Sequence, residues 1–210
     1  MKNLIFKLPK YPFDYLLLLD LLKTYSYPRN KINSLIKQGI IIRVKKGLYN
    51  LSPEFGGIID QNILANLIYG PSYISLEYAL SFWSLIPERV DIVTSITNKR
   101  NKSFETPVGR FTYKYINENI FYKGIIVQEN SNYSFLLASK EKAMCDKIAF
   151  VKGIETIDDM ELYLKYDLRI DFNELSGLDM DLLSDIANAY SSEPVEIFNR
   201  WYIEDFNRKV

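Results

Sequence analysis

The chain of 210 residues has no histidine and a single cysteine, and these absences exclude several kinds of site. Without histidine there can be no Ser-His-Asp triad, no Cys-His dyad and no imidazole-ligated metal. Cys145 alone can form neither an internal disulfide nor a multi-cysteine zinc site, and we expect it to be buried on a helix. Glycine-rich phosphate loops of the P-loop and dinucleotide-binding types are also absent. We therefore expect no cofactor, no metal and no enzymatic activity; a metal-dependent nuclease that uses carboxylates is the remaining enzymatic alternative.

Long apolar runs are missing as well. The longest one near the N-terminus, from Tyr15 to Leu19, ends at Asp20 and is much shorter than the ~20 residues that span a bilayer. No cationic start, apolar stretch and small-residue cleavage site follow one another as in a signal peptide. We expect a cytoplasmic protein with no membrane partner. Its apolar content of 48% is enough to pack the cores of one or two domains.

The net charge of zero conceals a gradient along the chain. Residues 1–52 contain ten basic and two acidic residues, residues 53–152 contain eleven and ten, and residues 153–210 contain five and fourteen. The three segments therefore carry charges of +8, +1 and −9. A basic N-terminal segment predicts a polyanionic partner at that end only. The acidic segment could bind a basic protein, pack on a basic face of the same chain, or stay solvated.

A basic helix is predicted between Tyr27 and Gly39. Pro28 suits the first turn of a helix, and Gly39 suits the position just after its end. Ile32, Leu35 and Ile36 share one face at helical spacing, and the opposite face is polar and cationic without a carboxylate. Such a face suits the major groove, because asparagine can pair with adenine while lysine and arginine reach guanine or phosphate. An ordinary solvated helix face is the alternative. The predicted DNA contacts on this helix are Arg29, Asn30, Lys31, Asn33, Ser34 and Lys37.

A basic hairpin is predicted directly after this helix. Residues 40–44 and 48–51 have the character of strands, and Gly47 can adopt the left-handed conformation that the turn requires. Arg43, Lys45 and Lys46 are the predicted phosphate contacts of this wing, which position a protein on DNA without reading its sequence. With an apolar helix over Phe13–Thr24, residues 1–52 are predicted to form a winged helix-turn-helix that binds double-stranded DNA.

The prediction of a winged domain has one structural departure and one alternative function. Only two helices are predicted before the hairpin, whereas winged domains usually have three. A turn around Tyr25–Pro28, or a double role of the first helix, would supply the third. A winged domain used only for protein contacts is the alternative function.

The remaining chain is predicted to be a linker over residues 53–60 and a mixed α+β domain over residues 61–210 with an acidic helical C-terminal part. The loop that contains Lys99, Arg100 and Lys102 is a candidate second phosphate contact, with a solvated turn as the alternative. Helices are expected over residues 61–69, 76–85, 140–151, 157–166, 179–189 and 195–206, and strands over residues 90–96, 109–116, 122–127 and 133–137.

Four groups of residues in a fixed order support a family resemblance. They are the basic helix with the run 39–49, the segment 73–75 with Ala79-Leu80, the segment 105–109 followed by Phe111 and Tyr113, and the segment 138–143 with Asp146. On these groups, over nearly its full length, the chain resembles the AbiEi family of bacterial antitoxins and transcriptional regulators.

The resemblance implies a winged head that binds inverted repeats in its own promoter and represses a type IV toxin–antitoxin operon. That operon would also encode a nucleotidyltransferase-like toxin of the abortive-infection type. Heads on an inverted repeat would make the protein dimeric on DNA. The family's second domain is associated with antitoxin action and with help in DNA binding. In this chain the help in DNA binding would come from residues 99–123, because residues past 153 are acidic. A protein-binding module that neutralises a basic toxin by direct contact, with DNA binding secondary, is the alternative function.

One helix pattern is left without a chemical role. Glu141, Lys142, Asp146 and Lys147 are expected to pair along a helix for a few tenths of a kcal/mol each.

Overall fold

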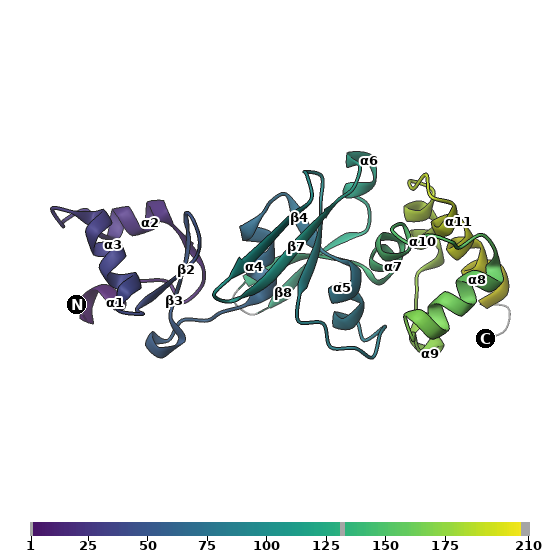
Figure 1. Cartoon of the computed structure of the whole chain (residues 1–210), viewed down its shortest axis with the longest axis horizontal. Coiled ribbons are helices and arrows are strands. Elements are labelled where there is room, and N and C mark those ends of the chain that lie inside the picture. The colour runs from purple at the N-terminus through teal and green to yellow at the C-terminus, as the bar shows by residue number, and fades with distance from the viewer. Residues whose placement is uncertain (1, 131–132, 207–210) are drawn as a thin grey trace.

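The computed structural model describes residues 2–130 and 133–206. Three parts follow one another along the long axis of the molecule: a small N-terminal part, a central sheet with its helices, and a helical layer around the C-terminal end (Figure 1). Helices and strands are mixed, as the α+β prediction requires.

The N-terminal part combines three helices with a three-stranded antiparallel sheet in the order β1-β3-β2. Its core contains Leu18 and Leu22 beside Ile32 and Leu35. The Asp14 side chain accepts a hydrogen bond from the Leu17 backbone N–H, which satisfies one of the free donors at a helix start. Its elements are α1 (Lys2–Ile5), β1 (Phe13–Asp14), α2 (Tyr15–Leu21), α3 (Pro28–Lys37), β2 (Ile41–Lys45) and β3 (Leu48–Leu51).

The basic helix and the hairpin occur where the sequence predicts them. Pro28 begins α3, and Gly39 follows its end with a φ of 68°. Gly47 has a φ of 89°, the left-handed value that the turn requires. The turn is shorter than predicted, because Lys45 belongs to β2 and pairs with Leu48.

The predicted helix over Phe13–Thr24 is wrong at both ends. Phe13 and Asp14 form a strand that pairs with Tyr49 and Leu48, and α2 ends at Leu21. The third helix before the hairpin is α1, near the N-terminus and not around Tyr25–Pro28. Two residues of strand carry too little pattern to be separated from the apolar run that follows them.

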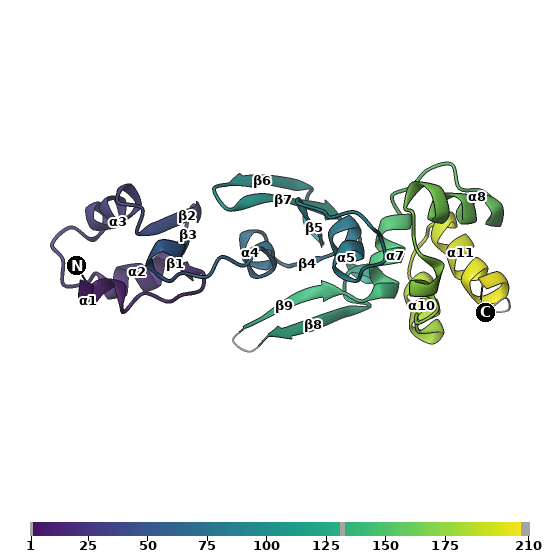
Figure 2. The same ribbon diagram turned by 90° about the horizontal axis from the view of Figure 1, so that it is seen from below.

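A six-stranded mixed sheet in the order β6-β7-β5-β4-β9-β8 forms the central part. Strand β4 pairs with β9 in parallel, as β5 does with β7, and the remaining pairs are antiparallel. Helix α4 packs on β4, β5 and β9, in the opening between the β6–β7 and β8–β9 arms (Figure 2). The elements are α4 (Gln61–Ile68), β4 (Ser72–Ile74), α5 (Leu76–Phe82), β5 (Val93–Thr97), β6 (Lys102–Thr106), β7 (Gly109–Tyr115), α6 (Glu118–Phe121), β8 (Ile125–Asn130), β9 (Tyr133–Ala138) and α7 (Lys140–Ile148).

Several central elements differ from the prediction. Strands β4 and β6 and the short helix α6 were not expected, and the strand predicted from Tyr122 begins at Ile125 because Tyr122 caps α6. The Lys99–Lys102 segment therefore leads directly into a strand at the edge of the sheet. In the linker, residues Pro53–Phe55 form a 3-10 turn.

The acidic C-terminal segment is a packed helical layer. Its buried side chains, among them Met160, Leu183 and Phe198, belong to the same core as the central sheet. The layer and the N-terminal part lie at opposite ends of the molecule, so the acidic segment does not pack on the chain's own basic face (Figure 1). Its elements are α8 (Ile157–Leu162), which continues as a π-helical turn (Tyr163–Asp167), α9 (Phe172–Leu175), α10 (Met180–Ala187), and α11 (Glu193–Arg200), which continues as a π-helical turn (Trp201–Phe206).

The back of the hairpin is fixed against the central part. Val44 and Leu48 belong to the larger core together with Leu64 and Ile68 of α4. The Ile58 backbone N–H also donates to a carbonyl of the N-terminal part, at 2.7 Å. Across the described ranges, no helix has the length and apolar character needed to cross a membrane.

Candidate nucleic-acid interface

The outer face of α3 brings together the residues predicted to read bases. Ile32 and Leu35 of this helix are buried, whereas Asn30, Asn33 and Lys37 on the other side are exposed. A shallow hollow of about 360 Å³ runs along this outer face, lined by Asn30, Asn33, Ser34, Lys37 and Gln38. Amides, a hydroxyl and an ammonium line it without any carboxylate, so it offers donors and acceptors to base edges at no cost in charge repulsion with phosphate.

One hydrogen bond already orders this face. The side-chain amide of Gln38 donates to the Ser34 hydroxyl at 2.6 Å. The hydroxyl keeps its own proton to donate, and the Gln38 carbonyl remains an acceptor. Ser34 and Gln38 therefore present a donor and an acceptor side by side on the outer face of α3.

The two basic residues on the flanks of α3 point to different surroundings. The Lys31 ammonium lies 5.5 Å from the centre of the Tyr25 ring, a cation–π distance. The Arg29 Nε donates to the Tyr15 hydroxyl at 3.2 Å, a contact between α3 and the start of α2. Arg29 is thus turned toward α2 and the hairpin, whereas Lys31 faces the segment between α2 and α3.

A second hollow, of about 310 Å³, separates α3 from the hairpin. It gathers three cations from three places in the sequence, namely Arg29, Arg43 and Lys46, and no acidic residue lines it. The other lining residues are Tyr15, Ile32, Asn33, Gly47 and Tyr49. The structure thus places two of the predicted phosphate contacts of the wing beside the basic helix.

Lys45 does not accompany Lys46. Its ammonium donates to the Ile68 carbonyl at the end of α4, and the side chain is half-buried. Burial, and after it the charge of Lys102, lowers the pKa of Lys45. A register irregularity between Arg43 and Lys45 accompanies this separation. We expected both lysines at the tip of the hairpin, and only Lys46 is exposed there.

Two predicted contacts of the second region, Lys99 and Lys102, lie close to the end of α4, where Lys45 also binds. The Lys99 ammonium donates to the Gly70 carbonyl at 2.7 Å, and the Lys99 and Lys102 ammonium groups lie 5.9 and 5.3 Å from the centre of the Tyr69 ring. Arg100 is exposed in the same loop. The carbonyl end of a helix attracts cations, which accounts for much of this cluster in structural terms. It is a second basic patch, distinct from the one around α3.

A fully buried ion pair occupies the centre of the second region. The Lys142 ammonium lies 3.2 Å from an Asp146 carboxylate oxygen, and neither side chain is exposed. Asp146 also accepts hydrogen bonds from Tyr73, Ser75 and Tyr190. Burial, and after it the carboxylate, raises the pKa of both tyrosines. The sequence pattern predicted weak pairs along a helix, whereas the structure shows a satisfied network that connects α7 with β4 and the C-terminal layer.

The neighbouring helix positions fit the same description. Cys145 is buried as predicted, and burial raises the pKa of its thiol. Glu141 is also buried and accepts hydrogen bonds from the Ser139 hydroxyl and the Asp179 backbone N–H. These contacts are structural, since Cys145, Glu141 and Ser139 are all buried.

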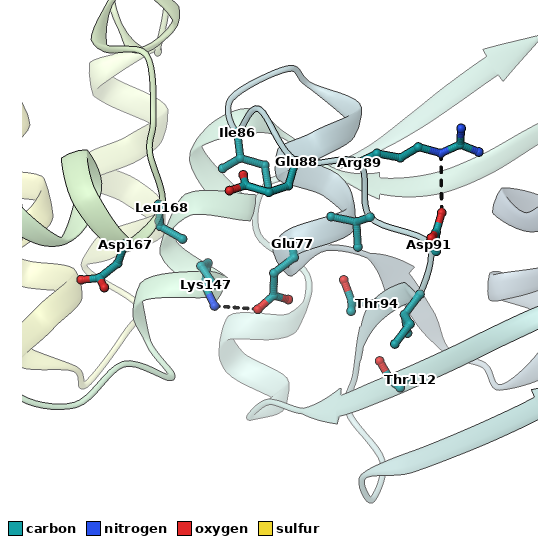
Figure 3. A pocket seen from close by; sticks show the side chains of 12 residues that line it. Glu77, Ile86, Glu88, Arg89, Asp91, Thr94, Thr112, Lys147, Asp167 and Leu168 are labelled. Carbon is teal, nitrogen blue, oxygen red and sulfur yellow. Dashed lines mark hydrogen bonds and ion pairs between the residues drawn. The ribbon is translucent and has the colours of Figure 1, made fainter.

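A hollow of about 680 Å³ in the second region lies between the central part and the C-terminal layer (Figure 3). Lys147 and Glu77 pair at its centre, at 2.6 Å, and Arg89 pairs with Asp91 at 3.5 Å. Glu88 forms an ion pair with Arg169. Because cations and carboxylates alternate around it, this hollow lacks the single sign of charge that distinguishes the one beside α3.

Tyr15 is the interface residue that sequence reasoning did not find. The apolar run around it suggested a buried helix, and nothing in that run indicates contact with Arg29. The contact depends on the angle between α2 and α3, which is a tertiary property. Among residues 2–130 and 133–206, no three acidic or cysteine side chains come together as metal ligands would.

Comparison with known proteins adds no assignment. No protein-family model matches the chain, and no curated protein matches it.

Proposed function

We propose that residues 1–52 form a winged helix-turn-helix that binds double-stranded DNA. In this arrangement α3 lies in the major groove and the Lys46 turn lies against the sugar-phosphate backbone. Three helices precede the hairpin, the number usual in winged domains. The observation that carries the proposal is the carboxylate-free outer face of α3 beside a hollow that three cations line.

The roles of individual residues follow from their positions. Asn30, Asn33, Ser34 and Lys37 share the outer face and would read base edges. Arg29, Arg43 and Lys46 lie at the flank and would bind phosphates. Lys45, Lys99 and Lys102 form the separate patch at the end of α4, with Arg100 exposed in the same loop, and are secondary to these contacts.

The biological role that we propose is autoregulation of a toxin–antitoxin operon, with this chain as repressor and antitoxin. The support for it is the resemblance to the AbiEi family in the order of motifs, together with the position of the candidate site in the N-terminal part, at one end of the molecule. An operator of inverted repeats would bind two heads and make the protein dimeric on DNA.

Binding to the DNA upstream of the chain's own gene tests this proposal. Fluorescence anisotropy over a range of salt concentrations should give a log–log slope of about −3 per head, because Arg29, Arg43 and Lys46 each release about 0.9 counterions on binding phosphate. Lys23→Gln is a matched control, since this exposed lysine of the same part pairs with Asp20. Weak binding with the same affinity for shuffled DNA would count against a sequence-specific repressor.

A second candidate function is direct contact with a basic toxin through the acidic layer. The observation that favours it is that this layer lies far from the basic end and keeps carboxylates such as Asp158, Asp171 and Asp181 exposed. Co-expression with the downstream reading frame tests it, because a stoichiometric complex that persists at high salt supports direct contact. Separate elution of the two proteins leaves repression as the function.

A further inference from the structure

The hollow between α3 and the hairpin has the properties of a site for one anionic group. Arg29 comes from α3, Arg43 from β2 and Lys46 from the turn, so three separate elements direct cations toward one space. Across the described ranges, no ion pair engages any of the three. Cations brought together without a counter-charge repel one another, and an anion between them relieves that repulsion.

Tyr15 gives this hollow a defined geometry. Its hydroxyl accepts the Nε–H of Arg29 at 3.2 Å, which leaves the terminal amino groups of the guanidinium for another partner. A guanidinium fixed in this way can bind two oxygens of one phosphate at the same time. The Arg29 side chain is long and exposed, so without Tyr15 it would keep its rotamer freedom until DNA binds. Losing that freedom on binding would cost binding free energy.

The size of the hollow fits a backbone phosphate with part of its sugar. Its volume of about 310 Å³ is ample for the five heavy atoms of one phosphate group. The side chains of Ile32 and Tyr49 line the same space and offer apolar contact to a deoxyribose. Asn33 lies at the edge shared with the outer face of α3, which connects this site to the base-reading surface.

We propose that this hollow seats one particular phosphate of the DNA backbone, and that Tyr15 is a positioning residue that holds Arg29 for it. The inference rests on the proposed function and adds to it a single phosphate that sets the register of α3 in the groove. Because phosphate contacts fix orientation without reading sequence, Tyr15 controls affinity and not base preference.

The test replaces single backbone phosphates of the bound DNA with neutral methylphosphonates and measures the affinity of each duplex. For the wild-type chain, one position in each half-site should weaken binding by about tenfold. Arg29→Gln should weaken binding to unmodified DNA and reduce the salt slope by about one. It should also lose less affinity than the wild-type chain when that same position is neutral, because only Arg43 and Lys46 still face the phosphate. Tyr15→Phe keeps the ring and should weaken binding by about two- to tenfold. Combined with Arg29→Gln it should add nothing.

The outcomes separate this inference from the proposed function. If the wild-type chain binds its DNA but Tyr15→Phe and Arg29→Gln leave affinity and salt slope unchanged, the phosphate site is wrong and DNA binding by α3 stands. Additive losses in the double variant, with normal thermal unfolding, also overturn the role of Tyr15. If inorganic phosphate or a mononucleotide binds the hollow while DNA does not bind at all, the hollow serves free phosphate ligands, and both this inference and the proposed function fail. Lys23→Gln is again the control, and its salt slope should match the wild type.

Discussion

Replacing Lys142 by methionine should destabilise the second region by about 3 kcal/mol. The lysine and Asp146 are both fully buried, and removing one partner of a buried ion pair typically costs ~3–5 kcal/mol because the other charge is left uncompensated. The lower end applies here, because hydroxyl groups of Tyr73, Ser75 and Tyr190 continue to bind the Asp146 carboxylate. A loss of this size is a large part of the ~5–15 kcal/mol that holds most domains folded.

Urea unfolding followed by tryptophan fluorescence measures this loss where it occurs. Trp83 and Trp201, the two tryptophans of the chain, both pack in the larger core that contains the network. With an m value of ~2–3 kcal/mol/M, the midpoint for Lys142→Met should fall by about 1–1.5 M. Lys140→Met, on the same helix but partly exposed, should change stability by less than ~0.5 kcal/mol.

A double variant separates the ion pair from general damage to the core. Asp146→Asn alone leaves the buried ammonium without its counter-charge, while Lys142→Met combined with Asp146→Asn removes both charges. The double variant should therefore be more stable than the sum of the two single losses predicts, by about 1–3 kcal/mol. A loss under ~1 kcal/mol for Lys142→Met, or strict additivity, would refute the reasoning.

Three further predictions concern the hairpin, α3 and the ion pair between Glu77 and Lys147. Lys46→Ala should make the salt slope of DNA binding shallower by about one. Lys45→Ala should leave that slope unchanged and loosen the contact with α4. Equal slopes for the two variants in anisotropy titrations would contradict the different roles of the two lysines. Asn30→Ala should lose about 1–3 kcal/mol of discrimination at one base pair without changing the salt slope, which a set of single-base operator variants would show. Burial alone would raise the pKa of Glu77, but the hydrogen bond and charge of Lys147 outweigh it and hold that pKa below its usual value. The pair therefore stabilises the fold above the unfolded-state pKa of the carboxyl, and this stabilisation is lost as the pH falls through the lowered folded-state pKa. Lys147→Met should accordingly move acid unfolding to higher pH. An unchanged acid-unfolding profile would contradict the assignment.

Local patterns predicted the elements that depend on neighbouring residues. Pro28, Gly39 and the spacing of Ile32 and Leu35 define α3, and Gly47 defines the turn of the hairpin. Strand β1 was not predicted, because it depends on β3, a partner strand distant in sequence. Strand β6 was also missed, although its partner β7 follows it directly in the chain. The helix α1, only four residues long, has no periodic pattern that could identify it.

The same distinction between local and tertiary features applies to the candidate site. The outer face of α3 follows from helical periodicity, so Asn30 and Lys37 could be assigned from the sequence. The separation of Lys45 from Lys46 follows from a register irregularity and from packing on α4, and the contact of Tyr15 with Arg29 follows from the angle between two helices. Sequence spacing carries no information on either.

The most direct test of DNA binding by the N-terminal part is a salt titration of the full chain on the DNA upstream of its own gene, beside shuffled DNA of equal composition. Between roughly 50 and 200 mM salt, the wild-type affinity for upstream DNA should fall with a log–log slope of about −3 per head, and Arg43→Ala with Lys46→Ala should reduce that slope by about two. Shuffled DNA should bind more weakly at every salt concentration. Equal affinity for both DNAs, or a slope that the double substitution leaves unchanged, would contradict the account.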